Sequence, residues 1–282
     1  MNILTFDIEE WFHILDHDST RTNNEWSNFP SRIHSSMEII FRILEDTNTK
    51  ASFFVLGWIA EKYPEIIKDI KNRGYEIGSH THFHQLAYNQ NRNEFTRDVE
   101  KSIKILQDIT GDKIRMFRAP GFSITEENKY CFEVLNQLGI EIDCSVFPAE
   151  RAHGGLKIHG LAEPFLLEYN GIKLKEFPIN THTIFNHPRV FSGGGYFRLL
   201  PYRVVKRLTL KTNYVMSYFH PRDFDYGQPL IKDLSVFRKY KSYVGLKKTE
   251  EKLINWLTDF TFMDIQVADT KINWGRVKTI KI

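Results

Sequence analysis

The sequence is short of the features that mark several common classes of protein. Its 282 residues include only two cysteines, Cys131 and Cys144, which do not make a disulfide scaffold, so we expect two free buried thiols. The formal net charge of +3, from 38 basic and 35 acidic residues, gives no reason to expect a nucleic-acid partner. No apolar run approaches a membrane span and no signal-peptide pattern precedes the first apolar run, so we expect a cytoplasmic protein without a transmembrane segment.

Short apolar runs alternate with amphipathic stretches along the chain. The apolar runs lie at 2–6, 51–56, 75–77, 140–145 and 214–219, and helical periodicity occupies 33–44, 57–73, 93–109 and 248–259. A further apolar run at 262–267 predicts a last strand. Repeated βα units predict a parallel sheet, and closing such a sheet into a barrel brings the carboxyl ends of its strands to one rim. We therefore predict an α/β fold, a distorted (β/α) barrel resembling a TIM barrel.

Two further features concern the organisation of the chain. Asn170-Gly171 lies between the apolar runs 165–168 and 172–177 and predicts an inserted β-hairpin. No linker or internal repeat is visible, so we predict a single domain over 1–282, with a carboxyl-terminal extension after about residue 225.

Three closely spaced histidines follow the strand predicted at 75–77. His80 and His84 are four residues apart, so on one turn or in a tight loop they can reach a single cation, and His82 would then point away. Histidines also occupy turns and make ordinary hydrogen bonds, so this spacing alone leaves both interpretations open. A carboxylate at another strand end would favour the metal site.

The first strand supplies such carboxylates. Asp7 and Glu9 follow the apolar run 2–6 and share one face of an extended chain. Glu9, His80 and His84 therefore form a candidate metal site with room for water. Asp7 is positioned to deprotonate that water, because it lies on the same face as Glu9.

Other predicted strands end in residues that complete this chemistry. Arg118 is a candidate to hold Asp7 ionised, His220 to protonate a leaving group, and Asp143 to keep His220 cationic. Each of these residues also has an ordinary interpretation, such as a structural ion pair or a turn histidine. Their occurrence at the ends of several strands favours metal-assisted hydrolysis.

The same residues carry a family resemblance. The sequence resembles NodB-type polysaccharide deacetylases of carbohydrate esterase family 4, and is most similar to the branch found beside exosortase and exopolysaccharide gene clusters. Five segments resemble that family's motifs in order: 5–11 (TFDIEEW), 80–84 (HTHFH), 118–122 (RAPGF), 143–148 (DCSVFP) and 219–225 (FHPRDFD).

This resemblance implies a barrel of seven strands and metal-dependent removal of acetyl groups from an N-acetylated saccharide. It implies that Asp7 is the base, that Arg118 is its partner, and that His220 is the acid. It also implies that the backbone N–H of Gly121 helps to hold the oxyanion. Zinc is the expected metal, with cobalt, nickel or iron as alternatives for the same ligands.

One position departs from the family's pattern. Many members have two adjacent aspartates in the first motif, of which the second binds the metal, and here that position is Ile8. Glu9 is a geometrically sensible replacement, because alternate residues of a strand share a face. Two alternatives remain: a metal-independent hydrolase of cyclic amides or imides on the same scaffold, and an inactive carbohydrate-binding protein.

Overall fold

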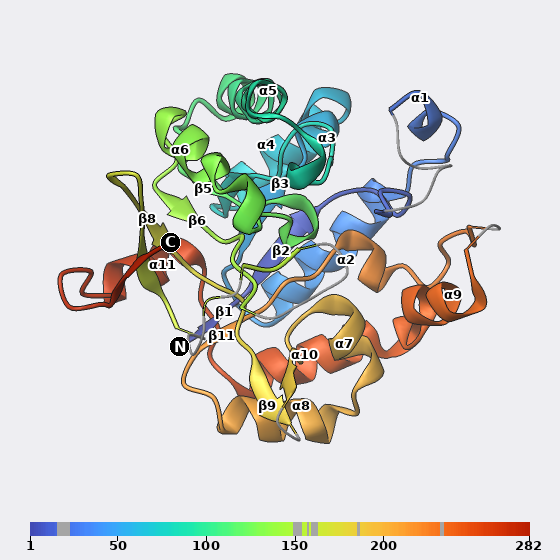
Figure 1. The fold of residues 1–282 in the computed structure, drawn as a ribbon. Helices are drawn as coiled ribbons and strands as arrows, with labels where there is room; N and C mark the ends of the chain where they lie inside the picture. Colours follow the sequence, from blue (N-terminus) through green and yellow to red (C-terminus); the bar gives the residue numbers. More distant parts are fainter. Residues whose placement is uncertain (16–22, 149–153, 157, 159–162, 185–186, 232–233) are drawn as a thin grey trace.

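A mostly parallel sheet of eight strands runs through the middle of the protein (Figure 1). The computed structural model describes residues 1–15, 23–148, 154–156, 158, 163–184, 187–231 and 234–282. The sheet order is β12-β7-β8-β6-β5-β4-β3-β2, and within it only β7 and β8 are antiparallel neighbours. These strands are β2 (Thr5–Ile8), β3 (Ser52–Val55), β4 (Glu76–Ser79), β5 (Met116–Phe117), β6 (Ile142–Asp143), β7 (Phe165–Tyr169), β8 (Ile172–Glu176) and β12 (Thr279–Lys281).

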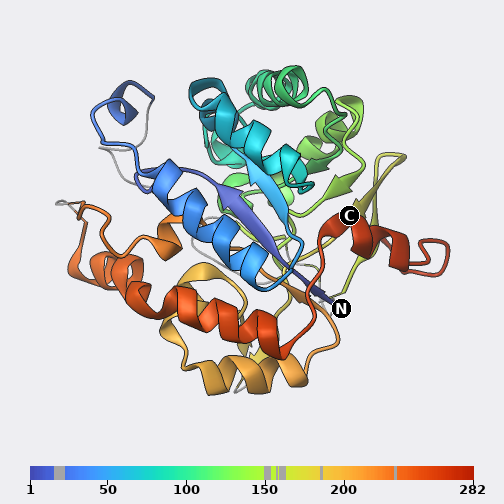
Figure 2. The same cartoon turned by 180° about the vertical axis from the view of Figure 1, so that it is seen from behind.

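Helices cover the strands from both sides. Helices α3 to α6 lie on one side in Figure 1 and α7, α8 and α10 on the other. Figure 2 shows α2 and α10 side by side on the back, where Arg42 and Glu250 form an ion pair of 2.7 Å. The helices are α1 (Asn23–Trp26), α2 (Ile33–Asp46), α3 (Gly57–Lys62), α4 (Pro64–Asn72), α5 (Arg92–Thr110), α6 (Tyr130–Gln137), α7 (Gly194–Leu199), α8 (Tyr202–Leu210), α9 (Val236–Tyr243), α10 (Thr249–Asp259) and α11 (Ile265–Lys271).

Two further strand pairs complete the secondary structure. β1 (Asn2–Ile3) lies parallel to β11 (Val215–Met216), and β9 (His182–Ile184) pairs with β10 (His187–Arg189). The chain beyond β11 continues beside β2, because Asp7 N–H donates to the Phe219 carbonyl at 2.8 Å. The strand that delivers Asp7 therefore has neighbours on both edges.

A side chain joins the chain after β8 to β11. The Asn180 amide oxygen accepts hydrogen bonds from the Met216 backbone N–H at 2.9 Å and from the Ser192 hydroxyl at 3.0 Å. Asn180 is fully buried, so this bridge replaces ladder hydrogen bonds in the interior. The bridge links the segment after β8 to β11, which pairs with β1.

The strands separate two hydrophobic clusters. Phe53 belongs to the larger cluster between strands and helices, whereas the next residue, Phe54, belongs to a smaller cluster with Met116 and Met216. Successive residues of a strand point to opposite faces, so the smaller cluster fills the space that the parallel strands surround. A Cβ on Gly78 would lie 2.8 Å from the Phe54 ring, which leaves only glycine room there.

The α/β class predicted from the sequence is confirmed, and so are the two free, buried cysteines. The predicted turn at Asn170-Gly171 joins β7 and β8, and β8 also pairs with β6 as a strand of the main sheet. The seven-strand count stays a prediction. The strand expected over 262–267 is wrong: Asp264 caps a helix there by accepting the Val267 N–H at 2.7 Å.

The described part of the chain contains no helix with the length and apolar character that a membrane crossing requires. The segment beyond residue 225 joins the larger core cluster through Leu253, Trp256 and Leu257 of α10.

Candidate active site

Asp7 and Arg118 form a buried ion pair between β2 and the chain after β5. Arg118 Nη1 lies 2.6 Å from Asp7 Oδ1 and 2.7 Å from the Thr5 hydroxyl, and the Arg118 side chain is fully buried. The guanidinium also stacks over Phe54, 4.2 Å from the ring centre. These contacts hold one Asp7 oxygen on Arg118 and leave Oδ2 for another partner.

Glu9, His80 and His84 come together beside this pair. One donor atom from each lies within 4.8 Å of the other two, and all three residues are buried. Glu9 Oε2 is 2.6 Å from His84 Nε2. Two imidazoles and one carboxylate are a donor set typical of catalytic zinc sites.

The loop after β4 aims the two histidines at Glu9. Thr81 and His84 both have left-handed backbones, with φ of 63° and 54°, a conformation that is strained for a β-branched residue. Asp98 of α5 holds this loop by accepting the backbone N–H groups of His82 and Phe83 at 2.9 Å each. The turn thus places His80 and His84 on one side.

His82 points away from the cluster, as the sequence predicted. Its Nε2 lies 3.4 Å from Glu61, and a Cβ on Gly57 would come within 2.7 Å of its Nδ1. His82 therefore packs against α3 and contributes nothing to the cluster.

The environment keeps the metal-ligand candidates in the form that binds a cation. Burial lowers the pKa of His80 to about 4, so the ring is neutral. Its Nδ1 lies 2.8 Å from the Arg118 carbonyl, which fixes the ring and leaves Nε2 for the cluster. Burial alone would raise the pKa of Glu9, but the His84 and His220 rings beside it hold that pKa well below its ordinary value.

The two adjacent glutamates have separate tasks. Glu10, unlike Glu9, points to the start of α2, where its carboxylate accepts the backbone N–H groups of Arg32 at 3.0 Å and Ile33 at 3.2 Å. It supplies the acceptor for helix N–H groups that would otherwise lack one, and its charge suits the helix N-terminus. Glu9 is therefore the carboxylate of this pair that remains available to a metal.

His220 lies across the cluster from the histidine loop. Its Nε2 is 3.8 Å from Glu9 Oε1 and 3.9 Å from Asp7 Oδ2, and about a quarter of its side chain is exposed. Burial alone would lower the pKa of His220, but the Glu9 carboxylate and the bond to Asp223 raise it to about 9. The ring is a cation at neutral pH and can donate a proton.

The carboxylate that supports His220 is Asp223, which corrects the predicted role of Asp143. Asp223 Oδ2 lies 3.2 Å from His220 Nδ1 and accepts the His220 backbone N–H at 2.9 Å. Asp223 Oδ1 in turn lies 2.9 Å from Nε of the buried Arg198. The i, i+3 spacing of His220 and Asp223 was visible in the sequence and was the available signal.

Asp143 instead belongs to a buried carboxyl pair below the site. It accepts the Ser145 hydroxyl at 2.6 Å, and Ser145 accepts the Ala119 backbone N–H at 2.8 Å. Glu176 lies beside Asp143 and accepts the Val146 N–H at 3.1 Å. Asp143 thus supports the segment that follows Arg118, and among the described residues no contact joins it to His220.

Two glycine segments border the site. Gly121 has a left-handed φ of 61° directly after Arg118-Ala119-Pro120, inside a short 3₁₀ turn. A Cβ on Gly194 would lie 2.1 Å from Asp223 Oδ2, and one on Gly193 would lie 2.1 Å from the Tyr218 ring. Gly193 and Gly194 therefore allow close packing against Tyr218 and Asp223.

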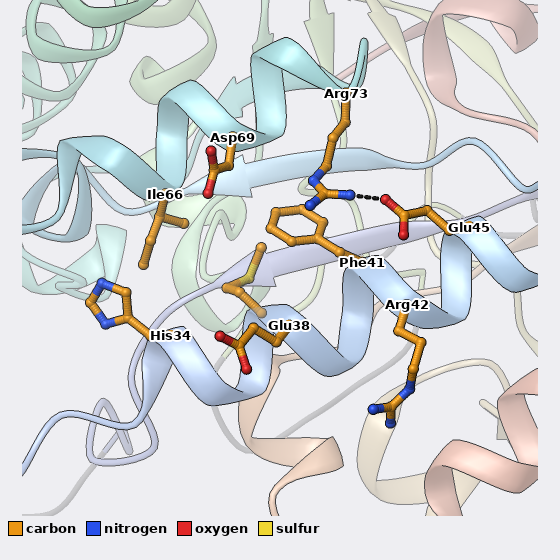
Figure 3. Close-up of a pocket in the computed structure, with 9 residues that line it drawn as sticks. His34, Glu38, Phe41, Arg42, Glu45, Ile66, Asp69 and Arg73 are labelled. Carbon is orange, nitrogen blue, oxygen red and sulfur yellow. Dashed lines mark hydrogen bonds and ion pairs between the residues drawn. The ribbon is translucent and has the colours of Figure 1, made fainter.

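A surface hollow of about 310 Å³ lies elsewhere, between α2 and α4 (Figure 3). His34, Phe41, Ile66 and Arg73 are among its lining residues, and Figure 3 shows Arg73 turned toward Glu45 in an ion pair. None of the predicted site residues lines it.

Two family models match successive segments of the chain. Residues 20–142 match the polysaccharide deacetylase model, and residues 144–269 match a domain of unknown function, DUF3473. The first match contains His80, His84 and Arg118, and the second contains His220 and Asp223. The site described above is therefore assembled from both matched segments and from Asp7 and Glu9, which precede them.

Curated relatives match over short segments. A peptidoglycan-N-acetylglucosamine deacetylase from Bacillus cereus is 39% identical over 83 residues, which cover 29% of this chain and 30% of that protein. A chitooligosaccharide deacetylase from Azorhizobium caulinodans is 28% identical over 113 residues, covering 39% of this chain and 52% of that protein. The chain thus matches about a third to a half of the length of these relatives.

Solved structures match over nearly the whole chain. A protein from Mycobacterium smegmatis assigned as a polysaccharide deacetylase has a TM-score of 0.68 at 16% identity, over 99% of this chain and 92% of that one. A pseudoenzyme of the same esterase family from Bacillus anthracis has a TM-score of 0.50 at 11% identity, over 94% of this chain and 64% of that one. At such identities the likeness concerns the fold. The family model over 20–142 and the curated relatives thus show a similarity to polysaccharide deacetylases in this part of the chain, and the solved structures show a shared fold.

Proposed function

We propose that this protein is a metal-dependent amidohydrolase that removes N-acetyl groups from an N-acetylated saccharide. The observation that carries the proposal is the convergence of Glu9, His80 and His84 within 4.8 Å, directly beside the buried Asp7–Arg118 pair. This arrangement supplies a metal site, a base and a partner for that base. The named activities of the matched relatives support the choice of an N-acetylated sugar.

The metal-ligand cluster fits zinc, because its two imidazoles and one carboxylate are buried and His80 is neutral. A bound metal would lower the pKa of a water and polarise the acetyl carbonyl. Asp7 takes the proton from the water through Oδ2, since Arg118 occupies Oδ1. The Gly121 N–H stabilises negative charge on the carbonyl oxygen.

His220 acts as the acid. The leaving amine needs a proton, and the cationic His220 ring lies within 4 Å of both Asp7 and Glu9. Asp223 holds the ring through Nδ1, so that Nε2 faces the reacting groups. The proposed base and acid thus lie next to each other, with Asp7 Oδ2 and His220 Nε2 3.9 Å apart beside Glu9.

The proposal also covers the compartment, the domain organisation, the family branch and the carrier of the substrate. We propose a cytoplasmic, single-domain enzyme of 1–282 from the exosortase-associated branch, acting on a polysaccharide or on its nucleotide- or lipid-linked precursor. The match of 144–269 to DUF3473 is consistent with a separate branch.

Acetate release from N-acetylglucosamine oligomers tests the proposal. We expect activity that a chelator removes and that zinc, cobalt or nickel restores. His80→Ala and Asp7→Asn should each lower kcat at least roughly a hundredfold. Full activity in chelator would favour the metal-independent hydrolase, and saccharide binding without any turnover would favour the inactive binding protein.

A further inference from the structure

Arg222 is a cation without an anionic partner next to the proposed active site. It lies two residues after His220 in the short 3₁₀ turn Pro221–Phe224 and is only partly accessible. Its Nη2 atom is buried and makes no hydrogen bond. The contact recorded for the guanidinium is the Tyr243 ring, whose centre lies 5.9 Å from Cζ. A buried N–H group of a guanidinium without an acceptor is costly, so its retention calls for an explanation.

The carboxylates around this site already have other close partners. The pairs are Asp7 with Arg118 at 2.6 Å, Glu9 with His84 at 2.6 Å, Asp225 with Arg32 at 2.8 Å and Asp223 with Arg198 at 2.9 Å. Within the residues that the structure describes, Arg222 is therefore the arginine of this region that no carboxylate binds. The local carboxylates therefore do not explain why an arginine stands at position 222.

Arg222 lies close enough to the proposed active site to interact electrostatically with its carboxylates. Burial lowers the pKa of Arg222 and the neighbouring Arg198 lowers it further, whereas the Asp223 and Glu9 carboxylates oppose that shift. Both carboxylates belong to the site, so the guanidinium lies within electrostatic range of the metal-ligand cluster. The adjacent Gln228 fixes the turn, since its Nε2 donates to the Arg222 carbonyl at 2.7 Å.

Gln228 gives a second observation at the same place. Its side chain is buried and its Oε1 accepts no hydrogen bond. A buried donor on Arg222 and a buried acceptor on Gln228, six residues later in the chain, are thus both unmatched. Buried polar atoms are almost always hydrogen-bonded, so two such atoms beside a proposed active site indicate a polar ligand.

We propose that Arg222 binds an anionic group, a phosphate or a carboxylate, carried by the saccharide substrate. The inference rests on the proposed function and narrows its substrate class to acidic N-acetylated sugars. A guanidinium offers paired N–H donors that match both anions. Neutral oligosaccharides should then be the poorer substrates.

Binding and turnover of three small ligands test this inference on the metal-loaded protein. The ligands are N-acetylglucosamine, N-acetylglucosamine 1-phosphate and N-acetylmuramic acid, which are neutral, phosphorylated and carboxylated. We expect calorimetry to show one anionic ligand bound roughly ten- to a hundredfold more tightly than the neutral one. The anionic ligand that binds more tightly shows whether the recognised group is a phosphate or a carboxylate.

Variants assign that preference to Arg222. Arg222→Met should abolish it, Arg222→Lys should retain part of it, and Arg203→Met, at an exposed arginine of α8, should leave it unchanged. A thermal melt checks folding, and we expect no loss of stability in Arg222→Met because no ion pair is removed. If Arg222→Met does not fold, the preference for the anionic ligand is compared between the wild type and Arg222→Lys, and an unchanged preference in Arg222→Lys overturns the inference.

The two failures are distinguishable. Equal affinity of the wild type for all three ligands, or an unchanged preference in Arg222→Met, overturns the anion site even if acetate is released. Absence of acetate release from every ligand, with an Arg222-dependent preference still present, instead overturns the proposed function.

Discussion

His220 Nδ1 lies 3.2 Å from Asp223 Oδ2, and the same oxygen accepts the His220 backbone N–H at 2.9 Å. One carboxylate thereby fixes both the ring and the backbone of the proposed acid. Arg198 anchors this carboxylate, and its guanidinium also donates to the Ser242 and Val244 carbonyls at 2.8 and 3.0 Å, at the end of α9. The proposed acid is therefore tied to elements that enter the site from outside the βα series.

Asp223→Asn should lower kcat roughly ten- to a hundredfold, with a smaller effect on KM. The amide keeps the shape but removes the charge that helps to hold His220 protonated, so the acid step suffers more than binding. Steady-state acetate release checks this, with Asp108→Asn on the exposed face of α5 as the control. A kcat within twofold of the wild type would rule out this role of Asp223.

Gly194 and Gly195 form a matched pair. A Cβ on Gly194 would lie 2.1 Å from Asp223 Oδ2, whereas on Gly195 the nearest atom would be 3.8 Å away. Gly194→Ala should therefore displace Asp223, lowering both kcat and the melting temperature, while Gly195→Ala should keep both or gain slightly in stability. Equal kcat values in the two variants would contradict the packing argument.

The buried pair of Asp143 and Glu176 predicts a pH dependence of stability. Burial raises the pKa of both groups, that of Glu176 well above its ordinary value, and the charge of Asp143 raises Glu176 further. The folded state then keeps a proton that the unfolded chain releases above about pH 4. The stabilisation is full below that pH and is lost as the pH rises toward the folded pKa, at up to about 1.4 kcal/mol per pH unit.

Glu176→Gln should flatten this slope, because the amide does not titrate. Urea unfolding between about pH 5 and about pH 8 measures the slope for the wild type, for Glu176→Gln and for the exposed control Glu100→Gln. Identical slopes in all three proteins would show that Glu176 does not hold the extra proton.

The sequence predicted the site residues better than it predicted their supports. Asp7 lies in β2, and Glu9, His80 and His84 follow β2 and β4 of one parallel sheet, so the strand pattern already predicted that they lie at the same edge. Asp98 interrupts the apolar stripe of the helix predicted at 93–109, and only the structure shows that it holds the histidine loop. Such supports depend on tertiary contacts, which residue spacing along one element does not encode.

The sequence pattern also gave a wrong prediction at one position where a helix cap determines the structure. The run from Phe262 to Val267 is apolar enough for a strand, yet Asp264 accepts the Val267 N–H and begins α11. Likewise, residue type alone does not show which of Glu9 and Glu10 faces the metal-ligand cluster. Glu10 faces the start of α2 and Glu9 faces His84, which follows from where the chain turns after β2.

The metal content of the two glutamate variants tests the central claim most directly. Glu9→Gln removes a proposed ligand, whereas Glu10→Gln removes charge only from the start of α2 and serves as its matched control. By elemental analysis we expect about one metal per chain in the wild type and in Glu10→Gln, and at least a tenfold loss of metal affinity and acetate release in Glu9→Gln. Glu10→Gln should instead lose about 1 kcal/mol of stability. Full metal content and activity in Glu9→Gln would contradict the assignment of Glu9 as the third ligand.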